Sequence, residues 1–92
     1  MTQLLCARVS RGLREADAIA TLRDVHGRQH FLQVEKDFLT HDNAHAYLPV
    51  AYVGRDARTG AVLVELPHEA ETGVNRLWVR AEDVRDSPEM SA

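Results

Sequence analysis

The apolar residues of this chain fall into short bursts separated by turn-forming residues, and few of these bursts are long enough for a stable helix. The clearest case is AYLPVAYVGRDARTGAVLVELP, residues 46–67. The segments on both sides of the connection 56–60 are rich in β-branched or aromatic residues, which favours strands. Gly60 can adopt a positive φ without steric cost, as a tight connection requires. The pattern therefore predicts a β-hairpin.

A second turn centres on Gly27, which separates DAIATLRD (17–24) from HFLQVEK (30–36). The overlapping segment 13–25 has a Glu, Ala, Leu and Arg content that also suits a helix. On a helical wheel, however, its apolar residues spread around the circumference and form no stripe. As a strand from Asp17, it pairs naturally across Gly27 with the segment that follows. We favour the strand, and the helix is the alternative.

Two further segments, VNRLWVR (74–80) and the weaker QLLCARV (3–9), also read as strands. Five or six short strands, with turns at intervals of about 8–12 residues, predict an all-β fold, a small antiparallel barrel or sandwich. RAEDV (80–84) predicts one short helical turn near the C-terminus. We expect a single domain over residues 1–85 and a polar, disordered tail over 86–92.

The segments FLQVEKDFL (31–39) and AYLPVAYVGRDARTGAVLVELP resemble small bacterial β-barrels of the PRC-barrel type and their SH3-like relatives of unknown function. In that family a D-x-x-T-G-x-V turn joins two barrel strands, and the matching residues here are Asp56, Thr59, Gly60 and Val62. The glycine-rich opening strand of the family is absent. The resemblance implies an SH3-like, PRC-type barrel and a non-catalytic adaptor that docks onto larger proteins or ribonucleoprotein assemblies. It transfers no catalytic residue.

The charge balance and the single cysteine exclude several classes of function. The net charge is -3 and the pI is near 5.9, so no global basic field attracts nucleic acid. Cys6 is the only cysteine, which excludes an intramolecular disulfide and a cysteine-based zinc ribbon. No stretch has the pattern of a signal peptide or the roughly 18 apolar residues of a membrane span. We expect a cytoplasmic protein.

The motif HDNAH places His41 and His45 four residues apart, a spacing that on a helix would offer two ligands to a metal. In an extended strand they would lie about 13 Å apart, at ~3.3 Å per residue, too far for one ion. Asp42 and Asn43 are turn formers, so we interpret the motif as a turn and expect no cofactor. The alternative is a bent loop in which Asp42 or His68 completes a metal site.

The other histidines and the acidic loop 66–73 suggest no chemistry. His26 and His30 flank the Gly27 turn, and we expect them to face solvent and at most to confer pH sensitivity. His68 stands beside two glutamates in the loop. No nucleophile accompanies them, and Cys6 falls in a predicted strand, so we predict no enzymatic activity.

Alternation in VNRLWVR places Leu77 and Val79 on one face and the sequence Arg-Trp-Arg on the other. Tryptophan and arginine are enriched at binding hot spots. The segment AYLPVAYV is apolar on both faces, which predicts that a second copy of the chain covers one of them. The predicted binding surface comprises Arg76, Trp78, Arg80, Tyr47 and Tyr52.

Three functions follow from these features. The leading one is a non-catalytic protein-interaction or adaptor module, homodimeric, which also docks onto a larger partner. The second is binding of RNA or single-stranded DNA through Arg76, Trp78 and Arg80, joined by Arg55 and Arg58. The third is a small metal- or ligand-binding protein that uses His41 and His45.

Overall fold

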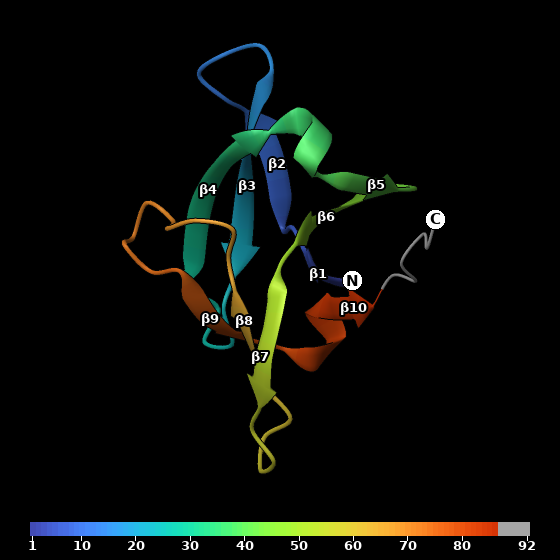
Figure 1. The fold of residues 1–92 in the computed structure, drawn as a ribbon, viewed down its shortest axis with the longest axis vertical. Coiled ribbons are helices and arrows are strands. Elements are labelled where there is room, and N and C mark those ends of the chain that lie inside the picture. Colours follow the sequence, from blue (N-terminus) through green and yellow to red (C-terminus); the bar gives the residue numbers. More distant parts are fainter. Residues whose placement is uncertain (87–92) are drawn as a thin grey trace.

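The computed structural model describes residues 1–86, and these form a mainly β structure (Figure 1). In chain order the elements are β1 (Thr2–Leu5), β2 (Arg8–Arg11), β3 (Asp17–Arg23), β4 (Gln29–Glu35), η1 (Lys36–Phe38), β5 (Thr40–Asp42), β6 (His45–Pro49), β7 (Ala51–Arg55), β8 (Val62–Glu65), β9 (Arg76–Val79), η2 (Ala81–Asp83) and β10 (Val84–Asp86). Both helical elements are single 3-10 turns, and η2 occupies the place where a helical turn was predicted.

The strands form three small antiparallel sheets, in the orders β10-β1-β6-β5, β2-β3-β4 and β7-β8-β9. Residues 1–86 close no barrel. Instead, the chain passes from sheet to sheet where strands follow one another almost without interruption. The N–H of Cys6 still donates to Ala46 in the first sheet, whereas that of Ala7 donates to Thr21 in the second. In the same way, only Val50 separates β6 in the first sheet from β7 in the third.

The hairpin predicted around residues 56–60 is confirmed as β7 and β8. The N–H of Asp56 donates to the carbonyl of Ala61 at 2.8 Å, and Gly60 has a φ of 78°. The register shifts between Tyr52 and Gly54, which marks a β-bulge. The sequence placed residues 46–54 in one strand, but the first half of this segment belongs to β6, because the chain changes sheets at Val50.

The strand prediction for the segment that precedes Gly27 is also confirmed. Strand β3 pairs with β4 along its whole length, and Gly27 between them has a φ of 81°. Ala18, Ala20 and Leu22 lie on one face of the strand and are buried, and Asp17 and Thr21 on the other face are buried as well. Pairing with β4 across the Gly27 turn therefore outweighs the helix propensity of this segment.

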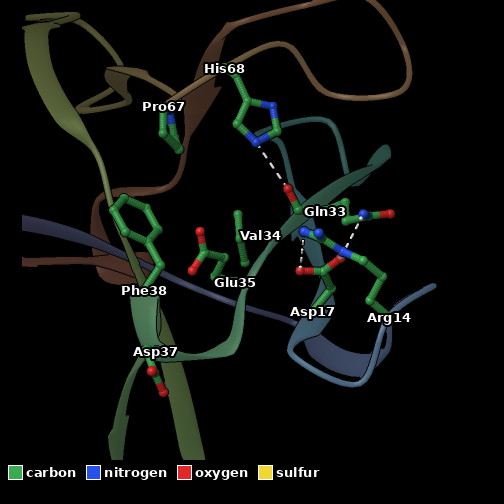
Figure 2. A pocket seen from close by; sticks show the side chains of 9 residues that line it. All are labelled: Arg14, Asp17, Gln33, Val34, Glu35, Asp37, Phe38, Pro67 and His68. Atoms are coloured by element: carbon green, nitrogen blue, oxygen red, sulfur yellow. Dashed lines mark hydrogen bonds and ion pairs between the residues drawn. The ribbon is translucent and has the colours of Figure 1, made fainter.

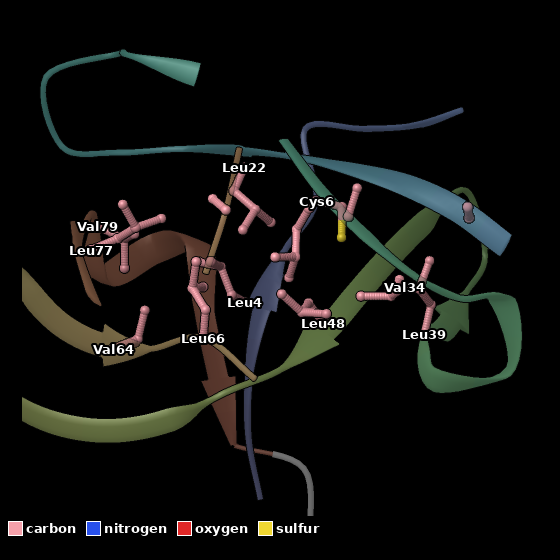
Figure 3. Close-up of a cluster of buried hydrophobic side chains, with 14 of the residues drawn as sticks. Leu4, Cys6, Leu22, Val34, Leu39, Leu48, Val64, Leu66, Leu77 and Val79 are labelled. Carbon is pink, nitrogen blue, oxygen red and sulfur yellow. The ribbon is translucent and has the colours of Figure 1, made fainter. Parts of the chain in front are cut away.

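One hydrophobic cluster draws side chains from all three sheets (Figure 3). Leu4 and Leu48 come from the first sheet, Leu22 from the second, and Val64 and Val79 from the third, and each of these side chains is fully buried. Burial of one such side chain contributes about 1.5–3 kcal/mol, so this cluster is the main source of stability.

Of the predicted tail, only Asp86 lies within the described residues. It ends β10 and pairs with Thr2, and the tail residues 87–92 lie outside the described part of the chain. No helix within residues 1–86 has the length and apolar character needed to cross a membrane.

Candidate interaction surface and pocket

The alternation predicted for β9 is confirmed. Leu77 and Val79 are buried, whereas Trp78 is 42% exposed on the opposite face. Directly across the sheet, Trp78 pairs with Leu63 and Arg76 pairs with Glu65, so these four side chains project from one face. We call this set, Leu63, Glu65, Arg76 and Trp78, the Trp78 face.

Carboxylates neutralise both Arg76 in β9 and Arg80, the residue that follows this strand. Nε of Arg76 donates to Oε1 of Glu65 at 3.0 Å, and Nε of Arg80 donates to Oδ2 of Asp83 at 3.4 Å. Hydrogen bonding to Asp83 raises the pKa of Arg80. The two guanidinium groups therefore sit in a locally balanced field rather than in a basic patch, which suits a protein partner better than a phosphate backbone.

Tyr52 lies on β7, two strands away from Trp78, and the register places it on the other face. Its direct partner is Val64, which is fully buried, whereas the partner of Trp78 is Leu63 on the outer face. Tyr52 is nevertheless 55% exposed and Val53 is 40% exposed, because β7 is the last strand of its sheet. We call residues 51–55 the β7 edge.

Tyr47 is placed apart from both surfaces, on β6 in the first sheet. The guanidinium carbon of Arg85 lies 3.5 Å from the centroid of its ring, a cation–π contact. The same guanidinium donates to Gln3 at 2.9 Å and to Asp42 at 2.8 Å. This arginine thus links β10 to β1, β5 and β6, so Tyr47 serves the fold. The structure brings Arg76 and Trp78 together, but not Tyr47.

The HDNAH motif forms the turn between β5 and β6, as predicted. Asn43 has a φ of 56°, a left-handed conformation that asparagine tolerates better than most residues. The register pairs His41 with Ala46 and His45 with Asp42, so the two imidazoles start from opposite faces of the hairpin. Within residues 1–86, no three His, Cys, Asp or Glu side chains are placed to hold a metal ion.

The prediction that the histidines around Gly27 face solvent is wrong for His30. This residue is 4% exposed because it pairs with Leu22 on the core side of β4. Its Nε2 lies 2.9 Å from Oδ2 of Asp24, and its Nδ1 lies 2.7 Å from Oγ1 of Thr72. Both ring nitrogens therefore have hydrogen-bond partners. This set of carboxylate, imidazole and hydroxyl groups connects the loop 67–75 to β4 and is not open to a substrate.

A pocket of about 530 Å³ opens where the end of β4 meets the loops before β3 and after β8 (Figure 2). This volume lies within the ~300–1,000 Å³ range of small-ligand sites. Its lining residues are Arg14, Asp17, Gln33, Val34, Glu35, Asp37, Phe38, Pro67 and His68. The sequence singled out only His68 among them, since the lining comes from three separate segments that show no common motif.

Three hydrogen bonds hold the walls of this pocket in place. The buried carboxylate of Asp17 accepts hydrogen bonds from Nε of Arg14 at 2.8 Å and from Nε2 of Gln33 at 3.1 Å. The bond from Arg14 is the main reason why the pKa of Asp17 is lowered, although burial opposes this shift. On the opposite wall, Nε2 of His68 lies 2.9 Å from the carbonyl oxygen of Gln33. The pocket is thus preformed.

Comparisons with family models, with curated proteins and with solved structures give no match to this chain. Its function must therefore be argued from the geometry. Nothing among the described residues points to enzymatic activity.

Proposed function

We propose that the chain is a non-catalytic protein-interaction module that acts as a homodimer. The observation that carries this proposal is the β7 edge. Within residues 1–86, β7 pairs with β8 alone, so its other side leaves backbone groups unpaired, and the strand also carries the exposed apolar residues Tyr52 and Val53. A free strand edge of this kind pairs readily with another strand, which adds main-chain hydrogen bonds to apolar contacts.

The second copy of the same strand is the simplest occupant of this edge. Two identical strands pair in antiparallel fashion around a two-fold axis perpendicular to the sheet, and this symmetry is the commonest in oligomers. The sheet β7-β8-β9 would continue into its copy as six strands. Because such an axis keeps the same face of both copies upward, the two Trp78 faces would lie on one side of the joined sheet.

This arrangement supports an adaptor function. Trp78 and Leu63 supply apolar area, while the pair formed by Arg76 and Glu65 supplies a polar rim, which is the usual composition of a protein-binding patch. Two such patches on one side of a dimer would bind a repeated or two-fold symmetric partner with avidity.

We also propose that the three sheets are a variant of the small SH3-like barrel of the PRC type. Support comes from the near-continuous strand pairs β1–β2 and β6–β7, which cross between sheets. The D-x-x-T-G turn also has a clear structural role. Oδ1 of Asp56 accepts the N–H of Arg58 at 2.9 Å, and Oγ1 of Thr59 accepts that of Ala61 at 3.2 Å.

Sedimentation equilibrium tests the dimer with a pair of matched variants. Val53→Lys places a charge on the β7 edge, whereas Leu13→Lys makes the same change at a loop residue that is 89% exposed. We expect a dimer for the wild type and for Leu13→Lys, and a folded monomer for Val53→Lys. A monomeric wild type, or a dimer that survives Val53→Lys, would contradict the proposal.

Salt-dependent retention of RNA by the Trp78 face would favour nucleic-acid binding instead.

A further inference from the structure

We propose that the pocket between β4 and the loops 12–16 and 67–75 binds a basic side chain, arginine or lysine, which an extended segment of a partner protein presents. This site is separate from the β7 edge and does not depend on the dimer. Its assignment rests on the charge of the lining, on the apolar surface beside that charge, and on an exposed leucine next to the pocket.

The lining has more negative than positive charge. Three residues with carboxylates, Asp17, Glu35 and Asp37, line the pocket together with one guanidinium group, that of Arg14. Asp17 and Arg14 neutralise each other through bonds of 2.8 and 3.2 Å. Within residues 1–86, Glu35 and Asp37 have no hydrogen-bond or salt-bridge partner. Lys36, which lies between them in the chain, lines a neighbouring hollow instead.

Glu35 is the carboxylate placed to meet a bound cation. Figure 2 shows its side chain between Phe38 and Val34, whereas the side chain of Asp37 points away from them. No residue in the described part of the chain donates a hydrogen bond to Glu35, although its charge interacts with that of Arg14, so an arriving guanidinium or ammonium group breaks no hydrogen bond there. A hydrogen bond to a charged group is stronger than a neutral one, so this carboxylate provides the specific contact.

The apolar part of the lining matches the stem of a basic side chain. Phe38 is 42% exposed, so its ring offers a face to solvent at the pocket. Pro67 stands near it in the opposite wall (Figure 2). The aliphatic stem of arginine or lysine packs on apolar surface while its charged end stays polar, and a cation over an aromatic face gains further stabilisation.

A neighbouring leucine indicates that the basic group belongs to a peptide rather than to a free amine. Leu13 precedes Arg14 in the loop 12–16 and is 89% exposed. This loop and η1, which contains Phe38, project from the same end of the molecule (Figure 1). An extended segment anchored in the pocket by its basic residue would cover Leu13 with a flanking apolar residue, whereas a small amine would leave it in water.

Nuclear magnetic resonance titration of the isotope-labelled chain tests this site. The probes are an acetylated tripeptide amide with arginine between two leucines, the same peptide with glutamine in place of arginine, and agmatine as a free cation. We expect saturable amide shifts confined to residues 13–17, 33–38 and 67–68 with the arginine peptide. Glu35→Gln should weaken this binding about fivefold, the upper limit for a partly exposed ion pair. The matched change Glu71→Gln, in the same loop as His68 but outside the lining, should leave it unchanged.

Several results would overturn the proposal: no saturable shift, equal binding of the glutamine peptide, or binding that is unaffected by Glu35→Gln. Agmatine binding as tight as that of the peptide would replace the peptide with a free amine as the ligand and so refute the assignment. The same titration on Val53→Lys separates the two proposals, because the pocket remains intact whether or not the chain dimerises.

Discussion

Replacing Asp24 by alanine tests whether the buried imidazole of His30 fastens the turn and the loop to the core. Oδ1 of Asp24 accepts the backbone N–H groups of His26 at 2.9 Å and Arg28 at 3.0 Å, and its Oδ2 meets the ring of His30. The substitution removes all three bonds. It leaves a ring nitrogen of His30 buried without a partner, because Thr72 occupies only the other nitrogen.

The cost follows from the burial of these groups. A buried polar group left unsatisfied costs about 1–3 kcal/mol, and the two lost bonds to exposed backbone groups add at most about 1 kcal/mol together, since water replaces them. We expect Asp24→Ala to lower the free energy of unfolding by about 3 kcal/mol. In a domain of this size that corresponds to a fall in Tm of about 12–24 °C. Urea unfolding followed by circular dichroism measures the difference.

Asp56→Ala is the matched control. Asp56 also accepts a backbone N–H in a hairpin turn, from Arg58 at 2.9 Å, but it has no buried imidazole partner. We expect this variant to lose no more than about 1 kcal/mol. If both variants lost the same free energy, or if Asp24→Ala lost less than about 0.5 kcal/mol, the imidazole would not carry the stability assigned to it.

The same carboxylate predicts a pH dependence. Burial acts to raise the pKa of Asp24, but hydrogen bonds from His30, Arg28 and His26 outweigh it, so the pKa lies below its ordinary value of 3.8. Ionised Asp24 therefore stabilises the fold above pH 3.8, and this contribution is lost as pH falls through the lower folded-state pKa. The neutral variant Asp24→Asn lacks this contribution at every pH. The difference in the free energy of unfolding between wild type and Asp24→Asn should therefore decrease at acid pH.

Two further predictions concern the core. Burial raises the pKa of Cys6 to about 12, so near neutral pH iodoacetamide should label this thiol about a thousandfold more slowly in the folded than in the urea-unfolded chain. Mass spectrometry measures the two labelling rates, and equal rates would contradict the burial of Cys6. Leu48→Ala should cost about 2–5 kcal/mol, since Leu48 is fully buried; thermal unfolding measures this loss, and a change below ~1 kcal/mol would show that the site lies outside the core.

The hairpins could be predicted from the sequence because their determinants are local. Gly27 and Gly60 both adopt the positive φ that a tight turn needs, and the residues beside them alternate or are β-branched. The outward position of Trp78 followed from the alternation of four residues in one strand. Each of these signals lies within a few positions of the feature that it predicts.

The division into three sheets could not be predicted, because the apolar pattern runs through the points where strands change sheet. Residues 3–9 and 46–54 each read as a single strand, although the backbone changes partners at Ala7 and Val50. The environment of His30 was missed for a similar reason. Its partner Thr72 is 42 residues away in the chain, so no local sequence pattern could predict the contact.

The pocket is equally non-local. Arg14, Glu35 and Pro67 come from separate segments that only the fold brings together. Glu35 and Phe38 occupy an ordinary strand end and a 3-10 turn, and neither position stands out in the sequence. A side chain that gains its role from neighbours distant in the chain is visible only once the sheets are assembled.

The central claim is that two copies of the chain pair along the β7 edge. Nuclear magnetic resonance on a mixture of isotope-labelled and unlabelled protein tests this claim most directly, when only contacts between a labelled and an unlabelled copy are recorded. The proposal predicts intermolecular contacts between Tyr52 and Val53 of the two copies, with none at Leu13. Intermolecular contacts confined to Trp78, or none at any residue, would contradict it.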